Sequence, residues 1–103
     1  MDKRKIKELE AKGWKVGDID EFLDLSEEEV AYIEMKVALS RKAREIRRKR
    51  KLTQVEVAER IGSSQSRVAK LEAGDKSVSL DLMIRSLLVL GASKEELAET
   101  IQG

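Results

Sequence analysis

The sequence contains no cysteine and no histidine among its 103 residues. Without cysteine, disulfide bonds, thiolate zinc sites and cysteine nucleophiles are excluded, which agrees with a reducing, cytoplasmic location. Without histidine, the chain lacks the commonest general base and the commonest metal ligand. A nucleophile paired with a base and a phosphate-binding glycine loop are also missing. We therefore expect neither an enzyme nor a protein that holds a metal or another cofactor.

Proline and long apolar runs are absent as well. A membrane-spanning helix needs about 20 consecutive apolar residues, and a signal peptide needs an apolar core near the amino terminus. The sequence has neither, so no membrane partner is expected. Charged residues make up 40% of the chain, which suits solvated helices. The length suits one domain with a modest core and some additional chain at one end.

The net charge is only +1, but the two signs are segregated along the chain. Acidic residues without a base among them occupy the stretch 18–34, namely Asp18, Asp20, Glu21, Asp24, Glu27, Glu28, Glu29 and Glu34. Basic residues fill 41–51, interrupted by Glu45: Arg41, Lys42, Arg44, Arg47, Arg48, Lys49, Arg50 and Lys51. Two interpretations stay open. In the first, both blocks are solvated helix faces that suit the helix dipole. In the second, the basic block faces phosphates and the acidic block binds a different partner.

Capping residues and apolar periodicity predict five helices and an all-α bundle. The first should start at Glu27 after the cap Ser26 and run to about Lys51, and the last should span Lys94 to about Ile101. Between them, the expected caps and stops are Thr53, Gly62, Ser64, Gly74, Ser79 and Gly91. The apolar residues of the last two helices, which should serve the core or a dimer contact, are Leu82, Leu87, Leu90, Leu97 and Ile101.

Residues 54–71, QVEVAERIGSSQSRVAKL, have the pattern of a helix-turn-helix. Ala58 is small enough to let two helices cross closely, and Gly62 can adopt the positive φ that ends the first helix. The second helix presents polar side chains that suit base edges and phosphates: Gln65, Ser66, Arg67 and Lys70. Glutamine and arginine make bidentate contacts to adenine and guanine. The alternative is an ordinary corner between two helices with a solvated polar face, and Ser63 stands where many such motifs have an apolar residue.

The longer run 44–74, REIRRKRKLTQVEVAERIGSSQSRVAKLEAG, resembles the Xre/Cro-repressor-like helix-turn-helix family. The pieces LTQ, AxxIGSSQ and KLExG carry the resemblance. It implies a compact bundle of about five helices, like the lambda-repressor DNA-binding domain, that binds operator DNA as a two-fold dimer. It also implies that Gln54 contacts phosphate and braces Gln65, that Arg47 and Glu72 form an internal salt bridge, and that bases are contacted from Gln65, Ser66, Arg67 and Lys70.

The expected partner is therefore double-stranded DNA with an inverted-repeat operator, bound by a homodimer whose recognition helices enter major grooves about 34 Å apart. Gln65 and Arg67 should discriminate bases, supported by Ser66 and Lys70. The complete set of expected DNA-binding residues is Thr53, Gln54, Ser64, Gln65, Ser66, Arg67, Lys70 and Lys76.

Residues 1–25 are not needed for this domain, so we divide the chain into an amino-terminal arm, 1–25, and a DNA-binding domain, 26–103. Apolar and polar residues alternate around Trp14, Val16 and Ile19, a pattern that can form a short strand. The arm either covers the bundle or binds a partner protein. The candidate partner-binding residues are Trp14, Val16, Ile19, Phe22 and Leu23.

The segment 16–29, VGDIDEFLDLSEEE, resembles the acidic segment that precedes the helix-turn-helix domain of HigA-type antitoxins. This narrower resemblance implies an antitoxin that neutralises a small basic ribonuclease and represses the promoter of its own operon. An acidic arm would complement the basic surface of such a ribonuclease. The alternative is a stand-alone Xre-type transcription regulator without a toxin partner.

Overall fold

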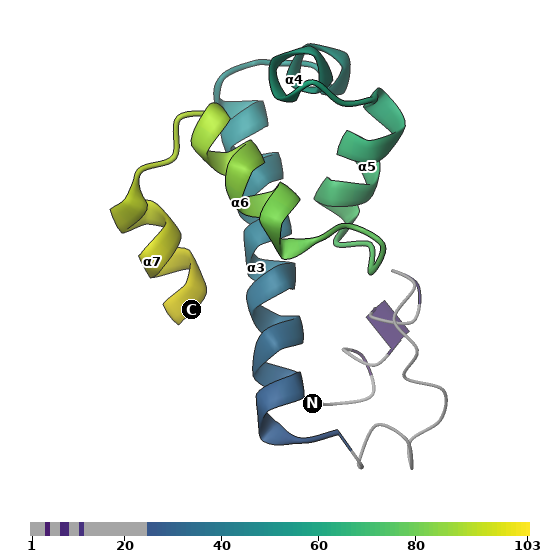
Figure 1. Cartoon of the computed structure of the whole chain (residues 1–103), viewed down its shortest axis with the longest axis vertical. Helices are drawn as coiled ribbons and strands as arrows, with labels where there is room; N and C mark the ends of the chain where they lie inside the picture. The colour runs from purple at the N-terminus through teal and green to yellow at the C-terminus, as the bar shows by residue number, and fades with distance from the viewer. Residues whose placement is uncertain (1–3, 5–6, 9–10, 12–24) are drawn as a thin grey trace.

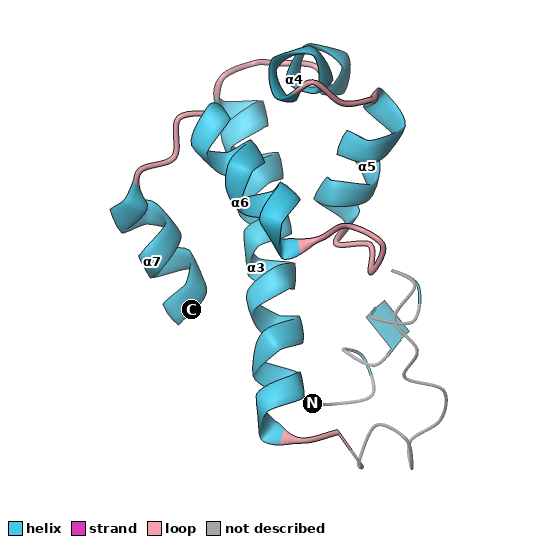
Figure 2. Ribbon diagram, in the orientation of Figure 1, coloured by secondary structure: helices cyan, strands magenta, loops and turns pink. Residues whose placement is uncertain are grey.

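A computed structural model describes residues 4, 7, 8, 11 and 25–103, and in this part of the chain helices are the only regular secondary structure. Five helices follow one another: α3 (Glu27–Lys49), α4 (Gln54–Ile61), α5 (Gln65–Ala73), α6 (Leu80–Val89) and α7 (Lys94–Gln102). Short loops connect them (Figure 2). The predicted all-α bundle with five helices is confirmed. The short strand expected around Trp14 lies outside the described residues.

The long helix α3 forms the axis of the bundle, and α5, α6 and α7 pack against it (Figure 1). Helix α4 crosses the far end of this axis and packs against α5 and α6. All five helices contribute to one apolar core. Its buried residues are Leu39, Ala43, Ile46, Val57, Ala58, Val68, Leu71, Val78, Met83, Leu87, Leu90, Ala92 and Leu97. Ile101 is more than one-third exposed, so it contributes less to the core than the other predicted positions.

A hydroxyl side chain caps the start of every described helix. The five caps are Ser26, Thr53, Ser64, Ser79 and Ser93, and each oxygen accepts a backbone N–H three residues later. At Thr53 and Ser93 the glutamate at the third helical position also accepts the N–H of the cap, which completes a capping box at each. The sequence Ser26–Glu29 predicts a third capping box, but there only the bond from the Glu29 N–H to the Ser26 hydroxyl forms. Each cap satisfies an N–H that the helix leaves without a partner, so the helix starts are determined locally.

The helix ends depend on residues in the left-handed conformation. Gly62, Gly74 and Gly91 have φ values of 66°, 71° and 96°. Lys51 has a φ of 58°, and the following Leu52 N–H donates to the Arg47 carbonyl at 3.0 Å. The first helix was predicted to extend to about Lys51, and it ends at Lys49 because the chain reverses at Lys51. Helix α6 ends at Val89, two residues before the predicted stop Gly91.

Candidate nucleic-acid interface

Helices α4 and α5 form the predicted helix-turn-helix. Gly62 ends α4 in the left-handed conformation, and Ser63 N–H donates to the Ala58 carbonyl at 2.9 Å. Ala58 is only 4% exposed, which is consistent with the close crossing that its small side chain permits. Val57 and Val68 bury their side chains on the inner faces of the two helices. The turn is thus fixed by backbone hydrogen bonds and by the core together.

The side chains expected to contact bases lie together on the outer face of α5. Gln65, Ser66, Arg67 and Lys70 are all exposed. No acidic residue occurs in the first two turns of this helix, and the N–H of Arg67 donates to the cap Ser64 Oγ at 3.1 Å. Outside the core, α5 therefore presents a polar and basic surface along its amino-terminal half.

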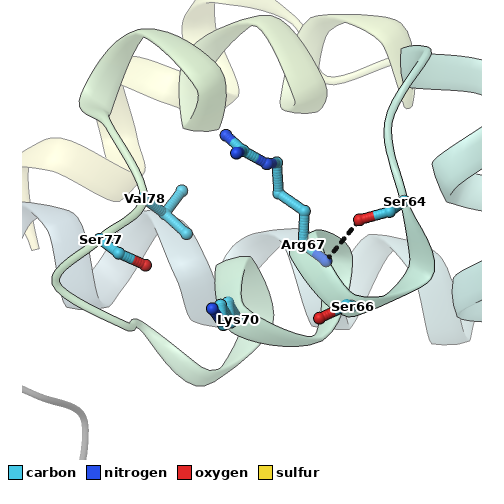
Figure 3. A pocket seen from close by; sticks show the side chains of 6 residues that line it. All are labelled: Ser64, Ser66, Arg67, Lys70, Ser77 and Val78. Carbon is cyan, nitrogen blue, oxygen red and sulfur yellow. Dashed lines mark hydrogen bonds between the residues drawn. The ribbon is translucent and has the colours of Figure 1, made fainter.

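A depression of about 260 Å³ lies between α5 and the α5–α6 loop, residues 75–78. Figure 3 shows Arg67 between Ser64 on one side and Ser77 and Val78 on the other. The complete lining is Ser64, Ser66, Arg67, Lys70, Ser77 and Val78, so it carries two cations and no carboxylate. Hydroxyl groups and cations of this kind bind phosphate oxygens. Lys76 is exposed on the same loop.

A chain of hydrogen bonds links the first residue of α5 to α3. Gln65 Nε2 donates to Gln54 Oε1 at 2.7 Å, and Gln54 Nε2 donates to Glu72 Oε1 at 3.4 Å. Arg47 Nε and Nη2 donate to the two oxygens of Glu72 at 2.6 and 3.0 Å. Both expected contacts, the Arg47–Glu72 ion pair and the bracing of Gln65 by Gln54, are confirmed.

The Arg47–Glu72 ion pair is shielded from solvent, since the two side chains are 16% and 6% exposed. Arg47 Nη1 also donates to the Leu52 carbonyl at 3.0 Å, so this guanidinium joins α3, the loop before α4 and the end of α5. The hydrogen bonds to Glu72 raise the pKa of Arg47 above its usual range. Arg47 is thus placed to hold the helices together, as the sequence predicted.

The remaining expected DNA-binding residues lie at the starts of α4 and α5. Thr53 is exposed at the start of α4, where its hydroxyl accepts the Glu56 N–H at 3.1 Å. Ser64 is exposed at the start of α5, and Gln54 is half-buried in the network between α4 and α5. Each backbone capping contact uses one lone pair of a hydroxyl, which leaves the O–H of Thr53 and Ser64 to donate to a phosphate.

Two further residues line depressions near these side chains and were not among the expected DNA-binding residues. Ser77 lines the depression beside Arg67. Arg44 lines a smaller depression of about 160 Å³ together with Arg47, Gln54, Ala69, Glu72 and Ala73. The signal for Arg44 was its position one helical turn before Arg47, which places both on one side of α3. For Ser77 the sequence held no signal, because its proximity to α5 depends on the path of the loop.

With this geometry established, comparison with known proteins identifies the family. The family model described as helix-turn-helix matches residues 44–97. The chain belongs to the helix-turn-helix family. The match covers more than half of the chain, from the second half of α3 to the first turn of α7, and confirms the Xre/Cro-like resemblance. No curated protein and no solved structure matches the chain.

The helix-turn-helix match supports DNA binding in transcription regulation. Residues 1–43 lie outside it. The candidate partner-binding residues of the arm also lie outside the described part of the structure: Trp14, Val16, Ile19, Phe22 and Leu23. Within the described part, no helix is long and apolar enough to cross a membrane, and no cluster of acidic side chains suits a metal ion.

Proposed function

We propose that this helix-turn-helix protein is a sequence-specific transcription repressor that binds an inverted-repeat operator as a homodimer. The observation that carries the proposal is the exposed polar face of α5, whose first residue is held by Gln54 and through it by the Arg47–Glu72 ion pair. A contact to a base edge needs a side chain held in a defined position, and this network provides it.

The hydrogen bonds around Gln65 leave it a defined pair of groups for a base. The Glu72 carboxylate only accepts hydrogen bonds, so it receives the amide N–H of Gln54, and Gln54 Oε1 in turn accepts from Gln65 Nε2. Gln65 therefore keeps its carbonyl oxygen and one N–H. An acceptor beside a donor matches the N6 and N7 edge of adenine.

In the same proposal, Arg67 contacts guanine in the major groove, and Ser66 and Lys70 support the base contacts. The residues at the helix starts and on the α5–α6 loop hold phosphates and set the register of the protein on the duplex. These phosphate contacts are assigned to Thr53, Gln54, Ser64 and Lys76.

A dimer would place two copies of α5 in successive major grooves on one side of the duplex. Apolar side chains exposed at the end of α6 support a contact between copies, since Leu88 and Val89 are 47% and 49% exposed. Analytical ultracentrifugation of the free protein and of the protein with DNA would measure the oligomeric state. A single chain per operator would contradict the dimer.

The experiment that tests the proposal is selection of random duplex DNA by the purified protein at physiological salt. Enrichment of an inverted repeat, with half-sites about one helical turn apart, is expected for a dimeric repressor. Weak binding that depends on salt, without an enriched sequence, would contradict sequence-specific recognition.

We also propose that the protein acts as the antitoxin of a small basic ribonuclease. The arm, residues 1–25, would supply the contact, with Trp14, Val16, Ile19, Phe22 and Leu23 as its apolar anchors. The exposed acidic residues Glu27, Glu28 and Glu29 at the start of α3 support this proposal, since they extend the negative charge of the arm into the folded domain. The cytoplasmic location remains a prediction.

Binding between the full chain and the product of a neighbouring gene for a short basic protein would test the antitoxin role. The double variant Trp14→Ala, Phe22→Ala should lose this binding and keep DNA binding. If no such neighbour exists, the protein is a stand-alone Xre-type regulator. If the variant retains full affinity for the ribonuclease, the arm is not the contact surface.

A further inference from the structure

Lys36 is a charged residue inside the bundle, far from both ends of α3. It is 4% exposed, although lysine is rarely buried unless it has partners. Its ammonium Nζ donates to the Val78 carbonyl oxygen at 2.6 Å and lies 5.7 Å from the centre of the Tyr32 ring. Burial lowers the pKa of Lys36, while the charge of Asp75 opposes this shift. A group that is costly to bury calls for a structural or functional reason.

The contact of Lys36 lies at the end of the α5–α6 loop. Within this loop, Val78 N–H donates to the Asp75 carbonyl at 3.2 Å and Ser77 N–H donates to Asp75 Oδ1 at 2.8 Å. At its start, Asp75 N–H donates to the Lys70 carbonyl at 3.0 Å. These bonds fix the internal shape of the loop. The bond from Lys36 and the buried Val78 side chain tie that shape to α3 and the core.

The same loop forms one wall of the depression beside the recognition helix α5. Ser77 and Val78 face Arg67 across it (Figure 3), and Lys76 is exposed between Asp75 and Ser77. Residues 75–78 have no helix of their own, so their position relative to α5 depends on such anchors. Lys36 lies outside the part of the chain that the family model matches, residues 44–97.

We propose that Lys36 is a positioning residue: its ammonium holds the Val78 carbonyl and thereby keeps Lys76 and Ser77 of the α5–α6 loop beside the recognition helix. The role at DNA rests on the proposed function. Lys36 itself is buried and does not touch DNA. It acts through the loop, in the way that Glu72 acts on Gln65 through Gln54.

The variant Lys36→Met keeps most of the side-chain volume and removes the ammonium. Its matched control is Lys42→Met, the same change on the same helix at a side chain that pairs with Glu45 and Glu96 and not with the loop. Amide hydrogen exchange of residues 75–79, followed by NMR in the full chain without DNA, is expected to accelerate in Lys36→Met and stay unchanged in Lys42→Met. Unchanged exchange in both would overturn the proposal, whether or not the protein binds DNA.

The second readout is a double-mutant cycle on the selected operator. Lys36→Met and Lys76→Ala should each weaken binding by about tenfold and lower the salt dependence by about one phosphate contact. Combined, they should cost little more than either alone, because both remove the same contact. Lys36→Met combined with Gln65→Ala should be additive, since Gln65 is braced by Gln54 and not by the loop.

Additive losses for Lys36→Met with Lys76→Ala would overturn the role of the loop at DNA. Lys36→Gln, which is too short to keep the same hydrogen bond, is the second variant and should repeat the effects of Lys36→Met. If neither variant folds, as measured by circular dichroism and urea unfolding, Lys36 is a stabilising core residue and the positioning role is wrong. If the unchanged protein binds no DNA, the proposed function is wrong. The hydrogen-exchange result then still tests whether Lys36 holds the α5–α6 loop in place.

Discussion

At the residue scale, the chemistry of the site depends on what each side chain is already bonded to. Arg47 and Arg67 are both arginines near the same helix, but Arg47 gives three of its donors to Glu72 and Leu52, whereas Arg67 is exposed. The Arg47 side chain is also only 16% exposed, so Arg67 is the better placed of the two to contact DNA. Glu72 differs from the acidic residues of α3 in the same way. Its oxygens accept hydrogen bonds from Arg47 and Gln54, whereas the acidic side chains of α3 are exposed.

Arg67→Ala is expected to cost about 1–3 kcal/mol of binding free energy on the selected operator and to relax the preference at one base pair in each half-site. The reason is loss of a bidentate contact to guanine. Fluorescence anisotropy on the operator, on operators changed at single positions and on random DNA measures the effect. Equal losses on operator and random DNA would show that Arg67 contacts only the backbone.

The control for this prediction is Lys76→Ala. A phosphate contact carries no sequence information, so this variant should weaken binding to all sequences alike and lower the slope of log K against log salt by about 0.9. A change in base preference would contradict the assignment of Lys76 to phosphate.

Glu72→Ala is expected to lower the free energy of unfolding by about 3 kcal/mol, because it leaves the largely buried Arg47 guanidinium without its charged partner. Urea unfolding measures this loss. The double variant Arg47→Met, Glu72→Leu should recover much of the stability, since apolar side chains can replace a buried ion pair. It should not recover operator affinity, because Gln54 then lacks its anchor. Full recovery of affinity would contradict the bracing role of the network.

At the element scale, helix starts and helix ends follow different rules in this chain. All five starts carry Ser or Thr caps, which the sequence shows directly. The other four ends of the described helices carry glycine with positive φ, but α3 ends through Lys51, a residue with a Cβ, at φ 58°. An L-residue in this conformation costs about 1–2 kcal/mol relative to its right-handed form. The conformation at the end of α3 therefore costs stability, and the free energy gained by burying the core outweighs this cost.

Lys51→Gly is expected to raise the free energy of unfolding by about 0.5–1 kcal/mol, because glycine adopts this conformation without the steric cost, while its extra freedom in the unfolded chain offsets part of the gain. The matched control is Lys49→Gly, at the last residue of α3, which should lower stability by about 0.5–1 kcal/mol. Thermal and urea unfolding check both. Equal destabilisation by the two substitutions would show that the conformation of Lys51 carries no strain.

At the scale of the whole molecule, charges of opposite sign lie at the two ends of α3. Helix α3 begins with Glu27, Glu28 and Glu29 and ends with Arg47, Arg48 and Lys49, which suits the helix dipole. The basic block does not form one surface, because Arg47 is held by Glu72 and the Arg50 guanidinium lies against Gly91. Arg47 and Arg50 therefore contact other parts of the protein, and a phosphate-facing role for the rest of the block stays a prediction.

The pH dependence of stability follows from this composition. No histidine titrates near neutral pH, so stability should change little between pH 6 and pH 8. Hydrogen bonds from Thr53 lower the pKa of Glu56 below its usual 4.5, and those from Ser77 lower the pKa of Asp75 below 3.8. Such groups stabilise the fold at pH values above their unfolded pKa, and this contribution disappears as the pH falls through the folded pKa.

The free energy of unfolding should accordingly begin to fall below about pH 4.5, as both carboxylates take up protons more readily in the unfolded chain. Urea unfolding between pH 2.5 and pH 8, with Glu56→Gln and Asp75→Asn for comparison, checks this: each variant should show a shallower decline in acid. If the free energy of unfolding falls as steeply with pH in both variants as in the unchanged protein, other carboxylates are responsible for the acid sensitivity.

The sequence by itself determined the features that depend on near neighbours. Caps, glycine stops and apolar periodicity act within one or two helical turns, so the five helices, the turn at Gly62 and the exposed face of α5 could all be predicted. The Arg47–Glu72 pair and the bracing of Gln65 by Gln54 were predicted through resemblance, because no spacing rule connects residues 25 or 11 positions apart.

Tertiary structure decided what depends on distant segments meeting. Lys36 shares its side of α3 with the core residue Leu39, yet only the path of the α5–α6 loop, 42 residues later, gives its ammonium a carbonyl to bind. The path of the same loop also places Ser77 beside Arg67. At Lys51 the chain reverses and ends α3, although no residue there is a helix-breaking glycine or proline. In each case the energy of packing, which no local pattern records, outweighed the preference of the residue itself.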